Sequence, residues 1–101
     1  MSKQQEITAY IIDNNGERPV KLAGRFGWAL EKLAEAGVKG LTTAELPAGI
    51  RWSHYVFRLR RDGFVIDMRR ERHSTPFTGS HGRYTLRSRV RIERPQVAEA
   101  A

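Results

Sequence analysis

Hydrophobic and polar positions alternate with a period of two in the first stretch of the chain. Ile7, Ala9 and Ile11 take one side of residues 6–13, which is the pattern of a half-buried strand. Asn15-Gly16 is a strong hairpin-turn signal. Pro19 follows in the return segment and cannot donate to a ladder, so that segment belongs at a sheet edge. The pattern predicts a β-hairpin over residues 6–23.

The period then lengthens to that of an α-helix. Phe26, Leu30 and Leu33 fall on one face of residues 25–37, and Gly37 suits a left-handed C-cap. A second, very short helix is predicted next. Thr42 and Glu45 have the spacing of a capping box, and a proline at position 47 stops the helix almost at once.

Residues 51–61 form the most amphipathic segment of the chain. The predicted buried stripe consists of Trp52, Tyr55, Val56 and Leu59. The opposite side collects Arg51, His54, Arg58 and Arg61, flanked by Ser53 and Phe57. No glutamate stands four residues away to pair with these cations. A buried side and an exposed basic side are therefore expected.

Hydrophobic and polar positions alternate again over residues 64–92. This pattern predicts a second hairpin with a turn-rich loop at 73–82. Phe64, Ile66 and Met68 are expected to face inward, and most alternate positions of the return strand are Arg. One register places Asp67 opposite Arg89 and Arg69 opposite Arg87. A two-residue slip pairs Asp67 with Arg87 and Glu71 with Arg83. In the first register, Arg69 and Arg87 need a phosphate or a nearby carboxylate between them.

Length and composition indicate one domain over residues 6–94, with a frayed start at 1–5 and a disordered tail at 95–101. The 101 residues include no cysteine, and no apolar run is long enough for a membrane span. A cytoplasmic protein is the simplest interpretation. Residues 1–50 carry equal numbers of cations and anions, whereas residues 51–94 carry twelve arginines against four acids. This asymmetry favours an anionic polymer as partner, although a solvated basic surface has the same composition.

The segments "FRLRRDGFVI" and "HGRYTLRS" resemble the end of the recognition helix and the wing of bacterial winged-helix domains, such as that of biotin repressors. The wider stretch 25–88 is similar to small stand-alone winged-helix proteins of phages and proteobacteria. The resemblance implies an α+β winged helix-turn-helix with an N-terminal β-hairpin. It also implies non-catalytic binding of double-stranded DNA, in a transcriptional regulator or a phage-related accessory factor. One departure is that the segment between Thr42 and Arg51 is shorter than the usual first helix and turn.

Docking of helix 51–61 in the major groove would assign roles to its exposed residues. Arg51, Ser53 and His54 suit base edges, and Arg58 and Arg61 suit phosphates. Phe57 suits a thymine methyl, a dimer contact or packing under the wing. On the wing, the expected DNA contacts are Arg69, Arg70, Arg72, His73, Arg83 and Arg87.

Other chemistries have little support in the sequence. His73 and His81 lack a third metal ligand, and Ser53 beside His54 lacks the setting of a nucleophile. No cofactor motif and no small-molecule site is evident. A homodimer joined through exposed Tyr10 or Ile12 would suit a specific operator. The main alternative is a protein–protein adaptor that docks on an acidic partner. RNA binding lacks an aromatic stacking platform.

Overall fold

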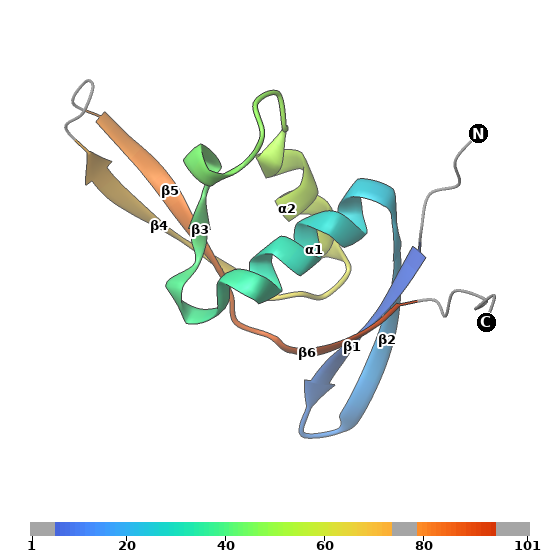
Figure 1. Cartoon of the computed structure of the whole chain (residues 1–101). Coiled ribbons are helices and arrows are strands. Elements are labelled where there is room, and N and C mark those ends of the chain that lie inside the picture. The colour runs from blue at the N-terminus through green and yellow to red at the C-terminus, as the bar shows by residue number, and fades with distance from the viewer. Residues whose placement is uncertain (1–5, 74–78, 95–101) are drawn as a thin grey trace, which may run out of the picture.

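The computed structural model describes residues 6–73 and 79–94 and has an α+β architecture. Two helices lie between two three-stranded antiparallel sheets (Figure 1). The elements are β1 (Glu6–Asp13), β2 (Gly16–Ala23), α1 (Gly24–Ala36), η1 (Gly37–Lys39), β3 (Leu41–Thr42), η2 (Thr43–Glu45), α2 (Trp52–Arg61), β4 (Ile66–His73), β5 (Gly79–Leu86) and β6 (Arg89–Glu93). The predicted ends 1–5 and 95–101 lie outside the described residues. No helix within the described ranges is long and apolar enough to cross a membrane.

The N-terminal hairpin confirms the period-two pattern. Ile7, Ala9 and Ile11 are buried, and β1 pairs with β2 up to Asp13 opposite Gly16. The strand order is β2-β1-β6, so the strand that contains Pro19 lies at an edge as expected. The other neighbour of β1 is β6, which comes from the far end of the sequence.

Helix α1 buries Ala29, Leu30 and Leu33 against α2 and the sheets. It ends at Gly37, whose φ of 59° lies in the left-handed region and whose N–H donates to the carbonyls of Leu33 and Ala34. Gly40 follows with a φ of 72°, and a Cβ there would lie 2.6 Å from the Tyr84 carbonyl oxygen. The close approach lets β3 pair with β5 directly after the turn.

Substitution of Gly40 by Ala should therefore be costly. Left-handed backbone and a clash with main-chain atoms act together, and we expect the free energy of unfolding to fall by about 2–4 kcal/mol. Gly49 is the matched control, because its φ is 84° but nothing lies within 4 Å of a Cβ built there. Gly49→Ala should cost only about 1 kcal/mol. Urea denaturation of both variants measures the difference; equal losses would contradict the crowding at Gly40.

The short second helix differs from its prediction. It is one 3-10 turn, and Thr42 makes no side-chain hydrogen bond to the backbone. The Thr42 hydroxyl instead donates to Glu45 Oε2 over 3.4 Å, so the capping box does not form. Leu46 is already extended ahead of Pro47, because the residue before a proline avoids helical dihedrals.

The strand register of the second hairpin differs from both registers that the sequence allowed. Asp67 lies opposite Thr85, and Arg69 lies opposite Arg83. The slipped alignment named the right ion pairs, Asp67 with Arg87 and Glu71 with Arg83, but these form as diagonal contacts. Residues 79–82 belong to β5 rather than to the predicted loop at 73–82. Phe64 and Ile66 are buried as predicted, whereas Met68 is 43% exposed.

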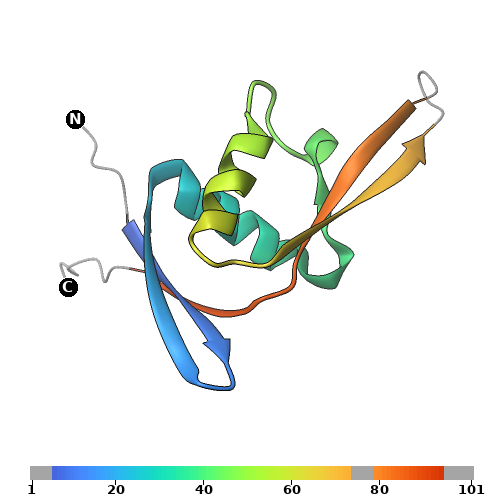
Figure 2. The same cartoon turned by 180° about the vertical axis from the view of Figure 1, so that it is seen from behind.

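The return strand of this hairpin ends at Leu86, so the predicted strand 83–92 is two strands in different sheets. The Arg87 N–H donates to the Val65 carbonyl, and the Ser88 hydroxyl accepts the Val65 N–H at 2.8 Å. The chain then crosses to β1, where Val90 lies opposite Ile11 and Ile92 opposite Ala9. Residues 87 and 88 therefore link the two sheets (Figure 2).

Candidate nucleic-acid interface

Helix α2 presents one side to the core and the other to solvent. Trp52, Tyr55, Val56 and Leu59 are buried, which confirms the predicted stripe. The exposed side carries the six residues expected there, Arg51, Ser53, His54, Phe57, Arg58 and Arg61. Phe57 is 61% exposed, so packing under the hairpin is wrong for this residue. In Figure 2 the helix lies on the near side of α1.

Two of the four basic side chains on this helix face have partners. Arg58 Nε lies 3.2 Å from Asp62 Oδ2 at the i, i+4 spacing, so an acidic partner exists that the sequence analysis did not count. The Arg58 guanidinium also lies 4.7 Å from the centre of the Phe26 ring, and the His54 ring lies 5.7 Å from that ring. Arg51 and Arg61 have no ion pair within residues 6–73 and 79–94.

Arg60 has a structural role that the sequence did not reveal. Its guanidinium donates to the Ile66 carbonyl through Nη2 at 2.6 Å and Nε at 3.2 Å. The Trp52 ring packs edge-on against Trp28 of α1 and Tyr84 of β5. These contacts fix α2 against the β4–β5 hairpin.

One face of the hairpin carries arginines that carboxylates already neutralise. Arg69 and Arg83 lie directly opposite each other, and Glu71 Oε2 bridges them at 3.4 Å and 2.7 Å. Glu71 Oε1 lies 3.2 Å from His81 Nε2. On the same face, Asp67 Oδ2 lies 2.6 Å from Arg87 Nε. The expected opposition of Arg69 and Arg87 is therefore wrong, and each has a carboxylate from its own hairpin.

The Arg83 guanidinium lowers the pKa of Glu71 from 4.5 to about 2, with His81 and Arg69 adding to the effect. A lowered folded-state pKa stabilises the fold above the ordinary pKa and loses that effect as pH falls. Glu71→Gln should therefore be less stable than the unmodified protein at neutral pH. The gap in urea midpoints should close as pH falls from about 4.5 to 2, and a gap independent of pH would contradict the ion-pair account.

The other face of the hairpin carries cations without such partners. Side chains alternate along a strand, so Arg70 and Arg72 share a face with Ile66 and with Tyr84, which packs on the core. Both arginines are exposed and have no ion pair among the described residues. His73 closes β4, and its side chain lies outside the described residues.

The elements after β2 run in the order helix, short strand, turn, exposed basic helix and hairpin, and they lie within the region that one family model matches. That model is described as a winged helix domain and matches residues 19–96. The chain belongs to the winged helix domain family. No curated protein and no solved structure matches it. By position in the chain, α2 corresponds to the predicted recognition helix, and β4 and β5 correspond to the predicted wing.

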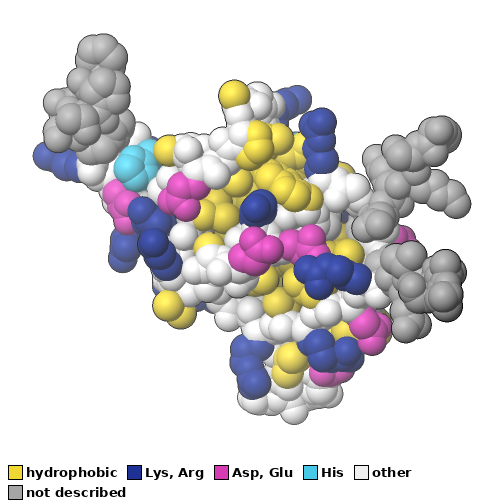
Figure 3. Space-filling view, viewed as in Figure 1, with side chains coloured by type: hydrophobic (Ala, Val, Ile, Leu, Met, Phe, Trp, Pro, Cys, Tyr) yellow, Lys and Arg dark blue, Asp and Glu magenta, His cyan; other side chains and the backbone are white. Residues whose placement is uncertain are grey.

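Winged helix domains are commonly DNA-binding modules without enzymatic activity. In this winged helix domain, Arg51 and Arg61 at the two ends of α2 and Arg70 and Arg72 on the core-side face of the wing have no ion pair among the described residues. The face seen in Figure 3, where α1 is in front, instead intersperses acidic with basic side chains. Of the side chains on and beside α1, Arg94 pairs with Glu31, and Lys32 lies 3.8 Å from Glu35.

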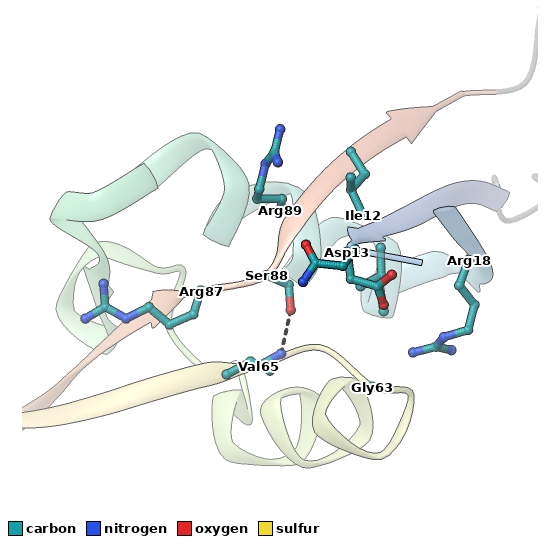
Figure 4. Close-up of a pocket in the computed structure, with 10 residues that line it drawn as sticks. Ile12, Asp13, Arg18, Gly63, Val65, Arg87, Ser88 and Arg89 are labelled. Carbon is teal, nitrogen blue, oxygen red and sulfur yellow. Dashed lines mark hydrogen bonds between the residues drawn. The ribbon is translucent and has the colours of Figure 1, made fainter. Parts of the chain in front are cut away.

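A groove lies where the N-terminal sheet meets the corner between α2 and β4. Arg18, Arg87 and Arg89 line it together with Asp13 and Ser88. Figure 4 shows that the three guanidinium groups point in different directions. They do not converge on one point, so the groove is not arranged for a single small anion.

The end of the predicted basic stripe serves the N-terminal sheet. Arg91 pairs with Glu17 at 2.8 Å and with Glu93 at 3.3 Å, and its guanidinium lies 4.1 Å from the Tyr10 ring centre. The two carboxylates raise the pKa of Arg91. Tyr10 and Ile12, expected to be exposed, are half-buried, so the homodimer stays a prediction without a defined surface.

Proposed function

We propose that this winged helix domain binds double-stranded DNA without catalysis, through the exposed side of α2 and the core-side face of the wing. The observation that carries the proposal is the distribution of unpaired cations. Arg51, Arg61, Arg70 and Arg72 have no ion pair among the described residues; the first two lie at the two ends of α2 and the other two on β4. A helix of this size fits the major groove, and a neighbouring hairpin can follow the adjacent backbone.

The roles within this interface follow from position along α2. Arg51, Ser53 and His54 stand at its N-terminal end and are proposed to contact base edges, with Phe57 against a thymine methyl. Arg61 and Arg58 are proposed phosphate contacts, and Arg58 would exchange Asp62 for phosphate. His73, at the end of β4, is also a proposed DNA contact. Arg69, Arg83 and Arg87 remain possible contacts only where phosphate displaces their carboxylates.

The function is tested by titrating labelled duplex DNA with the protein at several salt concentrations. Binding through phosphates releases counterions, so log K should fall linearly with log[salt], with a slope of about −0.9 per phosphate. Failure to bind any duplex at low salt would end the proposal. Binding to acidic protein in that case would favour the adaptor alternative. A role in transcription or in a phage-related process belongs to the same proposal.

Base reading has its own signature. Selection from a random duplex pool should give a preferred sequence, and Arg51→Ala or His54→Ala should flatten that preference by about 1–3 kcal/mol at the contacted base pair. Lys32→Gln on α1 should leave the preference intact. An unchanged preference in both α2 variants would remove these residues from the base-reading set.

A further inference from the structure

Two arginines from the electrically neutral first half of the chain lie beside α2. Arg25 stands at the start of α1, is exposed and lines an open groove with Phe26, His54 and Tyr55. Arg18 stands on β2 and reaches the C-terminal end of α2, where its Nη1 donates to the Asp62 carbonyl at 3.4 Å. A charge count along the sequence does not single out these two arginines, because the acids of β2 and α1 balance them in the sum.

The surroundings hold Arg25 in place without neutralising it. The Tyr55 hydroxyl accepts a hydrogen bond from its guanidinium and raises the pKa of Arg25. Phe26 contacts two residues of α2, with the Arg58 guanidinium over its ring and the His54 ring tilted at 55° to it. Arg25 has no carboxylate partner among the described residues, so its full charge remains available to a ligand.

Arg18 is placed by the corner that follows α2. Gly63 has a φ of 107°, and a Cβ built there would lie 2.2 Å from Arg18 Nη2. Glycine therefore leaves room for the guanidinium, which Figure 4 shows beside this corner. The helix C-terminus offers only a partial negative charge. No ion pair of Arg18 is present within residues 6–73 and 79–94, so most of its charge is uncompensated.

Arg25 lies on the side of α2 away from the wing, and Arg18 lies at the C-terminal end of the helix. Arg60 marks the wing side, because it bonds to Ile66 of β4. His54, Tyr55 and Arg58 mark the other side, because they contact Phe26 and Arg25 of α1. Free cations therefore flank α2 on both sides, from the wing and from the β2–α1 segment.

We propose that Arg18 and Arg25 form a second phosphate-binding edge, so that the protein grips the DNA backbones on both sides of the major groove that receives α2. The proposal rests on the proposed function and adds a preference for duplex over single strands. The major groove is about 12 Å wide and has a backbone along each wall. A single strand offers no second backbone at a fixed separation, so it can satisfy one edge only.

The test compares two double variants by fluorescence anisotropy on a labelled duplex over a range of salt. Arg18→Gln/Arg25→Gln should lower the slope of log K against log[salt] by about two units and weaken binding about 10- to 100-fold near 0.1 M salt. Lys21→Gln/Lys32→Gln is the control, because it removes the same charge from the same strand and helix. Lys21 faces the other side of β2 from Arg18, and Lys32 lies near Glu35. The control should keep the full slope.

The possible results distinguish a failure of the second phosphate-binding edge from a failure of the proposed DNA binding. Duplex binding with an unchanged slope in Arg18→Gln/Arg25→Gln, or an equal loss in the control pair, overturns the second edge and leaves the proposed function standing. No duplex binding by the unmodified protein overturns both. Circular dichroism checks folding, and Arg18→Lys/Arg25→Lys should restore the slope because the charges return. On a single strand of the same length, the arginine variant should lose less affinity than on the duplex.

Discussion

Replacement of Arg51, Arg61, Arg70 and Arg72 by Gln is expected to abolish duplex binding at physiological salt. Each lost contact, to a phosphate or, for Arg51, to a base edge, costs about tenfold in affinity near 0.1 M salt, so the four together cost about 10³- to 10⁴-fold. None of the four has an ion pair among the described residues, so their loss strands no carboxylate. The fold should therefore survive, and circular dichroism would show it.

The matched comparison is Arg69→Gln/Arg87→Gln, taken from the other face of the same hairpin. These guanidinium groups are bound to Glu71 and Asp67, and the slope of log K against log[salt] should stay within about half a unit of the unmodified protein. A loss of slope per arginine equal to that of the first variant would show that the two faces of the wing are equivalent. That result would remove the face distinction on which the proposed interface depends.

Replacement of Trp52 by Ala should have the largest effect on stability. The side chain is 2% exposed, and its ring packs against Trp28 and Tyr84, so it joins α2 to α1 and to the wing. Truncation of a buried aromatic residue costs about 3–5 kcal/mol, which is most of the stability of a marginal domain. Urea denaturation would measure the loss.

The control for this prediction is Trp52→Phe. The indole Nε1 is buried without a hydrogen-bond partner among the described residues, so the substitution removes an unsatisfied donor while keeping an aromatic ring. The expected cost is about 1–2 kcal/mol. A cost equal to that of the Ala variant would mean that the exact indole shape, rather than aromatic packing, determines stability here.

Burial explains what the sequence predicted well. The N-terminal hairpin, α1 and α2 each gather most of their apolar residues on one side, and the buried sets of β1 and α2 match the prediction residue by residue. Periodicity is a direct product of burial, so it can be read without knowing which element packs against which. The winged helix fold was predicted from the resemblance of two segments to the recognition helix and wing of known domains.

Strand partners were beyond this kind of reasoning. Residues 83–92 keep a period of two throughout, because Tyr84 and Leu86 of β5 and Val90 and Ile92 of β6 all fall at even-numbered positions. The pattern is the same in both sheets, so it does not mark the change of partner between them. Ser88 was the available signal, since a small polar residue at an inward position is a poor core residue. It instead accepts the Val65 N–H at the crossing.

The same limitation affected the candidate site. Whether an arginine has a carboxylate partner depends on the strand register. Arg83 pairs with Glu71, whereas Arg70, which precedes Glu71 on β4, does not. Proximity of distant segments matters as well. Arg25 lies beside His54 only because β2 delivers the start of α1 to the side of α2, and no local pattern encodes that.

Residues 87 and 88 carry the chain from β5 to β6, and β6 has β1 as its strand partner. The last strand therefore depends on the first. The family model begins at residue 19, within β2, and so leaves out β1. A fragment cut at that boundary would leave Val90 and Ile92 of β6 without Ile11 and Ala9 opposite them. We therefore expect the smallest autonomous folding unit to be larger than the region of family likeness, and expression trials of the isolated module should keep the chain from Glu6 onward.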